Sequence, residues 1–244
     1  MKQNLRFIIP DNIDTPIWRY LSLEKLKSLL ESKALYFTRA DLLGDSHEGS
    51  YSEPTIKRRP VFYEGATKHF IEEGLPDMNK MWRLCTYINC WHVNKGESIA
   101  MWKLYAKENK SIVIYSSISL LKKSILDVQK EFCLGLVNYI DYENDYMTEA
   151  NAFSPYFFKR KIYEHEKEFR ILTDELEKIN KVSKGEIKPP KGLLIPIDIK
   201  LLINKIVISP FSDIDFENEI IKLLKKYNLL NKLIHSSISR EPKF

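Results

Sequence analysis

The chain has 244 residues, enough for one large domain or two small ones with a substantial buried core. Hydrophobic residues make up 44% and charged residues 29%, which excludes a disordered, collagen-like or disulfide-framework protein. The whole net charge of +5 lies in the last 64 residues, with 12 basic and 7 acidic side chains, so overall basicity is poor evidence for nucleic-acid binding. With 13 Tyr, 12 Phe and 4 Trp against 8 Gly, the composition favours clefts lined with rings over glycine-rich phosphate loops.

No segment is typical of a targeting peptide or a membrane span. The apolar run at 5–10 is interrupted by Arg6 and is far shorter than either kind of segment. The three cysteines, Cys85, Cys90 and Cys133, form no Cys-x-x-Cys pair and fit a reducing compartment better than a secreted framework. We therefore expect a cytoplasmic protein that does not associate with membranes.

The first half of the chain alternates helical and extended patterns. Ser22 precedes leucines at 23, 26, 29 and 30, with Glu24 in the first turn, which predicts a capped amphipathic helix over 22–32. A strand over 34–38 and a polar loop over 39–52 follow. Further helices are predicted over 66–73, ended by Gly74, and over 98–108 and 119–130. Further strands are predicted over 82–92, 112–116 and 132–140.

The second half begins with an acidic loop over 141–151 and a strand over 166–172. A charged loop over 174–191, closed by Pro189-Pro190, is long enough to have a function of its own. The remaining predicted elements are strands over 193–197, 205–209 and 233–238 and an amphipathic helix over 215–227. No βαβ series and no linker is visible, which predicts a single α+β domain over 1–244 with a mixed, split sheet flanked by helices.

The sharpest local pattern is the acidic stretch 163–172. On a strand, alternation would place Glu164, Glu166, Glu168 and Arg170 on one face. Neighbouring carboxylates repel, so one of them could have a raised pKa suited to acid–base chemistry, and the row needs an arginine, a metal or a developing carbocation beside it. The alternative is an exposed helix in which Glu166 and Arg170 pair at i, i+4.

Aromatic residues accompany a possible anion site. Arg19, between Trp18 and Tyr20, would be stacked and stiffened by the two rings, which suits a phosphate ligand. It could equally extend along a hydrophobic edge. Trp102 and Tyr105 share one helical face, either as walls for a planar base or nicotinamide or as core.

The loop that follows Tyr36 is rich in acids, among them Asp45 and Glu48. It could position a ribose or an acceptor, or its acids could form helix caps and turns. Because it lacks well-spaced second ligands, we expect no metal site there. Walker, G-x-S-x-G, dinucleotide-glycine and H-E-x-x-H motifs are absent from the sequence.

Taken in order, these stretches resemble a family of bacterial proteins known as a domain of unknown function, DUF2971. The resemblance rests on Trp18-Arg19-Tyr20, Leu35-Tyr36-Phe37-Thr38, Gly44 to Glu48, Cys90-Trp91-His92, Met101 to Ala106, Glu166 with Glu168 and Arg170, and Ile206 to Pro210. Two departures are Ser46-His47, where the family usually has proline and an aromatic residue, and Lys110-Ser111, where a glycine is common.

The layout of that family is similar to that of ADP-ribosyltransferases, which implies NAD as the substrate. The resemblance implies that Glu168 stabilises positive charge on the ribose, while Glu166 orients or deprotonates the acceptor. It further implies an NAD-binding set of Arg19 at the pyrophosphate, Tyr36 or Tyr105 on the nicotinamide, Tyr20 and Trp102 nearby, and Arg170 holding the glutamates. Asp45 and Glu48 would belong to the acceptor loop.

Three functions stay open at this point. The first is an NAD-consuming ADP-ribosyltransferase or NAD glycohydrolase, a toxin or anti-phage effector with a protein or nucleic-acid acceptor. The second is a metal-dependent nuclease or RNA-binding module that uses the basic C-terminal end. The third is a non-enzymatic partner-binding domain in which Glu166, Glu168 and Arg170 form a buried ion-pair network.

Overall fold

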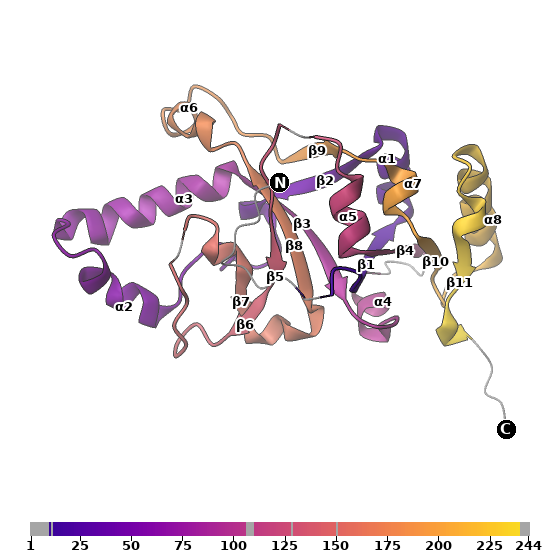
Figure 1. Cartoon of the computed structure of the whole chain (residues 1–244), viewed down its shortest axis with the longest axis horizontal. Helices are drawn as coiled ribbons and strands as arrows, with labels where there is room; N and C mark the ends of the chain where they lie inside the picture. The colour runs from indigo at the N-terminus through magenta and orange to yellow at the C-terminus, as the bar shows by residue number, and fades with distance from the viewer. Residues whose placement is uncertain (1–9, 11, 106–109, 128, 150, 240–244) are drawn as a thin grey trace. The chain divides into compact units, whose positions relative to one another are not determined.

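A computed structural model describes residues 10, 12–105, 110–127, 129–149 and 151–239 (Figure 1). The chain forms two compact units. Of the described residues, unit 1 comprises those within 37–89 and 129–193, and unit 2 comprises those within 10–36, 90–127 and 194–239. Each unit is assembled from several separate chain segments, and the expectation of a single domain stays a prediction.

Unit 2 contains a sheet with both parallel and antiparallel pairing. Its strands are β1 (Pro16–Ser22), the end of β3 (Thr86–Val93), β4 (Ser111–Ser117), β10 (Lys205–Ile208) and β11 (Leu233–His235). Strand β1 pairs antiparallel with β3 and with β4, β10 pairs antiparallel with β4, and β11 pairs parallel with β10. The run Ile112–Ile114 is fully buried, as expected for β-branched residues in a strand with neighbours on both sides.

The helices of unit 2 begin at hydroxyl or carboxylate caps. They are α1 (Leu23–Ser32), α4 (Ile99–Tyr105), α5 (Ile118–Ser124), α7 (Ile199–Leu202) and α8 (Ile214–Lys226). Ser22 accepts from the Lys25 amide at 3.4 Å and Asp213 accepts from the Phe216 amide at 2.8 Å. Helices α5 and α7 lie side by side (Figure 1).

Unit 1 contains the second group of strands. They are the end of β2 (Ala34–Arg39), the start of β3, β5 (Cys133–Leu136), β6 (Asn138–Ile140), β7 (Phe158–Arg160), β8 (Glu168–Asp174) and the start of β9 (Gly192–Pro196). Strand β3 pairs antiparallel with β2, and β8 pairs with β3 and antiparallel with β5. A separate parallel pair, β6 with β7, lies beside the turn that precedes β8.

The helices of unit 1 are α2 (Glu53–Phe62), α3 (Leu75–Cys85) and the short α6 (Ile179–Ser183). Figure 1 shows α2 and α3 as neighbouring helices, and the helical segment η2 (Phe70–Gly74) leads directly into α3. Short helices η1 (Ala40–Leu42), η4 (Ser154–Phe157), η5 (Lys161–Glu166) and η6 (Leu176–Lys178) complete this unit. In unit 2, η7 (Leu230–Lys232) precedes β11 and η8 (Ser237–Ser239) follows it.

Several element boundaries differ from the predictions. Gly74 does not end a helix, because its right-handed helical φ of −60° lets the chain continue into α3. The predicted strand 82–92 is helical up to Cys85, and the predicted helix 119–130 ends at Ser124. The strand predicted over 132–140 is divided into β5 and β6, the loop 174–191 contains α6, and the strand 233–238 ends at His235. Residues 5–9, 106–108, 128 and 150, which belong to predicted segments, lie outside the described residues.

The α+β class with a mixed sheet is confirmed by the pairing, because parallel and antiparallel strands occur with helices between them. Among the described residues, no helix combines the length and the apolar character that crossing a bilayer requires.

Candidate functional site

A buried group of charged side chains lies at the start of β8 in unit 1. Glu168 and Arg170 are two residues apart on the strand, so they share a face as predicted. Arg170 Nε donates to Glu168 Oε2 at 2.5 Å, while Nη1 and Nη2 donate to the two oxygens of Glu48 at 2.5 and 2.9 Å. The Tyr156 carbonyl also accepts from Nη1, at 2.6 Å. This fork of donors fixes both carboxylates in position.

Lys159 supplies a second buried cation from strand β7. Its ammonium donates to Glu168 Oε1 at 2.7 Å and also to Glu166 Oε2. The positive partner that the acidic row requires is thus a lysine together with an arginine. Sequence reasoning missed Lys159, because a lysine beside Phe158 and Arg160 gives no sign that it is buried.

Glu166 reaches this cluster from a turn and not from the strand. The predicted strand over 166–172 is wrong at its start, because η5 ends at Glu166 and Lys167 has a positive φ of 41°. That left-handed residue turns the chain and brings the Glu166 side chain next to Glu168. Glu164 stays exposed, so the predicted row of three strand carboxylates is also wrong.

The neighbouring carboxyls have opposite pKa shifts. Burial alone would raise the pKa of Glu168, but the charges of Arg170 and Lys159 hold it well below its usual range. Burial, a hydrogen bond to Glu168 and the charge of Glu168 raise the pKa of Glu166 to about 7. One carboxylate therefore stays ionised while its neighbour can gain or lose a proton near neutral pH, a pattern found in acid–base sites.

The loop 39–52 contributes two buried acids to unit 1. Glu48 binds Arg170, and burial raises its pKa although the Arg170 charge opposes this. Asp45 accepts from Arg160 Nη2 at 2.6 Å and from the His47 amide at 3.0 Å. Burial would raise the pKa of Asp45, but these hydrogen bonds lower it. Both acids serve the folded loop, and their part in an acceptor site stays a prediction.

Arg19 occupies a different setting, on β1 in unit 2. Its Nη1 donates to the Cys90 carbonyl at 3.2 Å, and its guanidinium lies 5.7 Å from the centre of the Trp91 ring. No carboxylate of the described residues forms an ion pair with it. Burial lowers its pKa to about 10, although nearby Cys90 and Tyr105 oppose this. A desolvated guanidinium without a carboxylate is a candidate anion site.

The predicted stacking of Arg19 between Trp18 and Tyr20 is wrong. Neighbouring strand residues point to opposite faces, and Trp18 and Tyr20 pack together in a core cluster with Trp102. The ring that Arg19 contacts is Trp91, which lies on the neighbouring strand β3.

The predicted aromatic walls divide into core and surface. Trp102 is fully buried, and its ring meets Tyr20 edge to face at 5.0 Å between ring centres. Tyr105 stacks on Tyr20 with 6.3 Å between the ring centres. Tyr105 is 43% exposed and Tyr36 is 44% exposed. Tyr36 and Tyr105 thus have ring surface that a ligand could cover, whereas Tyr20 and Trp102 support the rings around them.

The structure therefore forms two clusters from the predicted residues. Unit 1 brings together Glu48, Glu166, Glu168 and Arg170, and unit 2 holds Arg19 and the aromatic group. Within the part of the chain that the structure describes, no group of three or more His, Cys, Asp or Glu side chains could hold a metal ion.

No protein-family model and no curated protein matches the chain, so membership of DUF2971 stays a prediction. Among solved structures, the chain is similar to Thermus sp. 2.9 DarT in complex with ADP-ribosylated ssDNA (TM-score 0.36, 10% identity, 94% of this chain and 92% of that chain). It is also similar to Thermus sp. 2.9 DarT in complex with carba-NAD+ (TM-score 0.35, 12% identity, 95% and 94%). At these TM-scores, function must be inferred from the side chains themselves.

Proposed function

We propose that the protein is an NAD-consuming ADP-ribosyltransferase or NAD glycohydrolase. The observation that carries the proposal is the carboxyl pair of unit 1, in which Arg170 and Lys159 bind Glu168 and Lys159 also binds Glu166. Breaking the nicotinamide–ribose bond builds positive charge on the ribose, much as glycoside cleavage does, and a fixed carboxylate stabilises that charge. Glu168 is proposed for this role.

The charge balance of the cluster supports a base role for Glu166. Arg170 and Lys159 supply two positive charges, and Glu48 and Glu168 two negative ones. Ionised Glu166 then leaves the group with one net negative charge, and protonated Glu166 leaves it neutral. Burial and the charge of Glu168 raise the pKa of Glu166 to about 7, so Glu166 can change its protonation state near neutral pH. In its ionised form Glu166 can accept a proton from water or from an acceptor, while Arg170 positions Glu168.

Arg19 is proposed to bind the pyrophosphate of NAD. Its guanidinium is desolvated and has no carboxylate partner among the described residues, so a phosphate would supply the missing counter-charge. Tyr36 or Tyr105 would stack on the nicotinamide ring, supported by Tyr20 and Trp102. A protein or nucleic-acid acceptor and a role as a toxin or anti-phage effector are part of this proposal.

The test is release of nicotinamide from NAD by the purified full chain, followed by chromatography. Glu168→Gln should lower the rate by at least about 100-fold, as expected for loss of transition-state charge stabilisation. Glu166→Gln should lower it and remove the pH dependence near 7. Glu164→Gln, an exposed neighbour outside the cluster, is the matched control and should leave the rate unchanged. Full activity in a folded Glu168→Gln protein would contradict the assignment.

The same network also fits a non-enzymatic partner-binding domain. Glu48, Glu168 and Arg170 are buried, and each has a charged partner inside the cluster, as a purely structural ion network would. That function predicts that Glu168→Gln lowers the melting temperature and that the wild-type chain releases no nicotinamide. Nicotinamide release by the wild-type chain would exclude it.

A further inference from the structure

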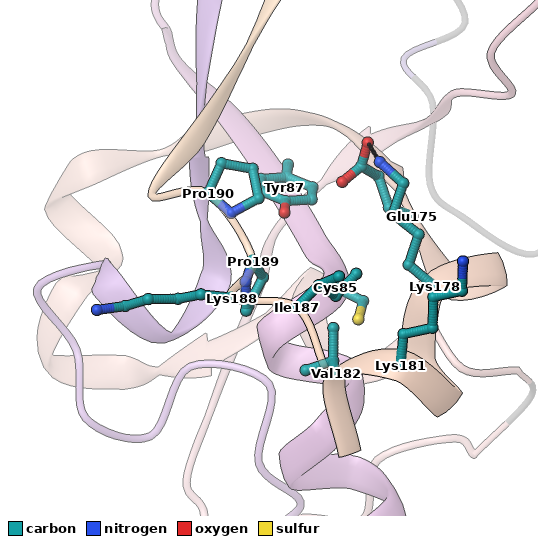
Figure 2. A pocket seen from close by; sticks show the side chains of 10 residues that line it. All are labelled: Cys85, Tyr87, Glu175, Lys178, Lys181, Val182, Ile187, Lys188, Pro189 and Pro190. Carbon is teal, nitrogen blue, oxygen red and sulfur yellow. Dashed lines mark hydrogen bonds and ion pairs between the residues drawn. The ribbon is translucent and has the colours of Figure 1, made fainter. Parts of the chain in front are cut away.

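The charged segment 174–191 borders a cavity of unit 1 that the proposed chemistry does not use. The cavity has a volume of about 330 Å³, at the lower end of the range for small-molecule sites (Figure 2). It is lined by Cys85, Tyr87, Glu175, Lys178, Lys181, Val182 and Ile187 to Pro190. Its walls therefore come from the end of α3, the start of β3 and the segment itself.

Arg39, which does not line the cavity, holds the Pro189-Pro190 wall in place. Arg39 Nη1 donates to the Pro189 carbonyl at 2.7 Å, and the Arg39 amide donates to the Lys191 carbonyl at 3.0 Å. Asp41 in turn fixes the Arg39 guanidinium through two hydrogen bonds of 2.6 and 3.1 Å. The apolar surface of the two prolines is thus presented in one defined position, which lowers the entropy cost of binding a flat ligand.

Two polar groups lie within this apolar lining. The Tyr87 hydroxyl is fully buried and makes no hydrogen bond of normal geometry to any residue that the structure describes. Burial, followed by the nearby charge of Glu175 and a weak interaction with its carboxylate, raises the pKa of Tyr87, so its hydroxyl stays a neutral donor. Glu175 accepts from Lys178 Nζ at 2.6 Å through Oε1 (Figure 2). The lining thus holds a donor, Tyr87, close to an acceptor, Glu175.

We propose that this cavity binds a flat heterocycle with a hydrogen-bond acceptor next to an amino donor, the edge presented by the adenine base of a nucleotide. The ring nitrogen would accept from the Tyr87 hydroxyl, and the amino group would donate to Glu175. The buried hydroxyl would then exchange its weak interaction with Glu175 for a hydrogen bond of normal geometry to the ring nitrogen. The ring faces would pack on the prolines and on Val182.

The rim of the cavity suits an anionic tail on that base. Lys181 is exposed at the edge of the cavity and pairs with no acid of the described residues, so it can meet a phosphate (Figure 2). Lys188 points away from the cavity in Figure 2 and has no part in the proposal. The inference does not depend on ADP-ribosyl transfer, since it requires no residue of the acidic cluster.

Calorimetric titration of the full chain with adenosine 5′-monophosphate tests this site. Tyr87→Phe should weaken binding about tenfold or more, because the phenylalanine keeps the ring and removes the donor. Tyr63→Phe, a half-buried tyrosine of the same unit outside the cavity, is the matched control and should bind normally. Lys181→Ala should weaken binding of the monophosphate but not of adenosine. Purine riboside 5′-monophosphate, which lacks the amino group, should bind to the wild-type chain as weakly as adenosine 5′-monophosphate binds to the Tyr87→Phe variant.

Other outcomes would overturn the proposal. Absence of binding by the wild-type chain at millimolar nucleotide would do so, as would equal affinity of the two phenylalanine variants. Loss of binding in Arg19→Met but not in Tyr87→Phe would place the nucleotide at the proposed NAD site instead. Should Tyr87→Phe fail to fold, Val182→Trp fills the cavity from a partly exposed position and must abolish binding.

Discussion

Removing both members of the Glu48–Arg170 pair should destabilise the protein by less than the sum of the two single removals. The two side chains are each 1% exposed, and they are joined by hydrogen bonds of 2.5 and 2.9 Å. Arg170→Met leaves the Glu48 carboxylate buried without a counter-charge. Glu48→Gln costs less, because Arg170 keeps its bonds to Glu168 and to the Tyr156 carbonyl.

The magnitude follows from the separation of the charges. Two unit charges about 4 Å apart attract by about 4 kcal/mol at an effective dielectric constant of about 20. Breaking a buried pair costs about 3–5 kcal/mol, so we expect that loss for Arg170→Met and about 2–3 kcal/mol for Glu48→Gln. In the double variant no charge of this pair is left uncompensated, and its cost should fall below the sum of the single costs by about 2 kcal/mol or more.

Urea unfolding at pH 7, followed by circular dichroism, measures each free energy in this cycle. The exposed pair Lys57–Glu53 is the matched control, with side chains 73% and 61% exposed, and charge removal there should change stability by less than about 0.5 kcal/mol. If Arg170→Met is too unstable to purify, Arg170→Lys can replace it. The lysine keeps the positive charge but lacks the planar guanidinium that donates to both Glu48 oxygens, so the loss of unfolding free energy should be smaller. Additive single costs within about 0.5 kcal/mol would refute the coupling.

Three further predictions follow from the same contacts. The raised pKa of Glu166 means that the folded chain holds this proton more tightly than the unfolded chain, so its contribution to stability is present below about pH 4.5 and lost as pH rises through about 7. Glu166→Gln should make the free energy of unfolding measured in urea change less between pH 5 and pH 8. The same pH dependence in the variant and the wild-type chain would contradict this. Gly49→Ala, with φ +72° and a Cβ that would overlap the Tyr156 ring, should lower the melting temperature clearly more than Gly65→Ala, where φ is +86° and nothing lies within 4 Å. Arg19→Met should raise the KM for NAD more than it lowers kcat, and an unchanged KM in a folded variant would remove Arg19 from the substrate site.

Local patterns predicted much of the secondary structure. Helix α1 has its predicted cap at Ser22, and α8 and strands β2, β4 and β10 lie within one or two residues of their predicted bounds. Each of these segments has a clear apolar period or a capping residue within its own length. The predictions around Gly74 and over 82–92 were wrong because strand-favouring aromatic residues and helix-favouring residues occur together in these segments. In such segments the packing partners decide the conformation.

The candidate site was predicted in part. Alternation along β8 correctly placed Glu168 and Arg170 on one face. The position of Glu166 depends instead on the left-handed turn at Lys167, and a lysine gives no local sign of positive φ. The second cation, Lys159, belongs to a different strand and could not be recognised from its neighbours along the chain.

By itself, the sequence determined the α+β class, the capped helices and the shared strand face of Glu168 and Arg170, because these depend on spacings of a few residues. Only the tertiary structure decided which charges meet. Arg170 pairs with Glu48 at a separation of 122 residues, and the contact ring of Arg19 is Trp91 on another strand. The pKa of a carboxylate depends on whether it is buried beside a cation or exposed to water. Its burial and its charged neighbours depend on which segments distant in sequence pack around it.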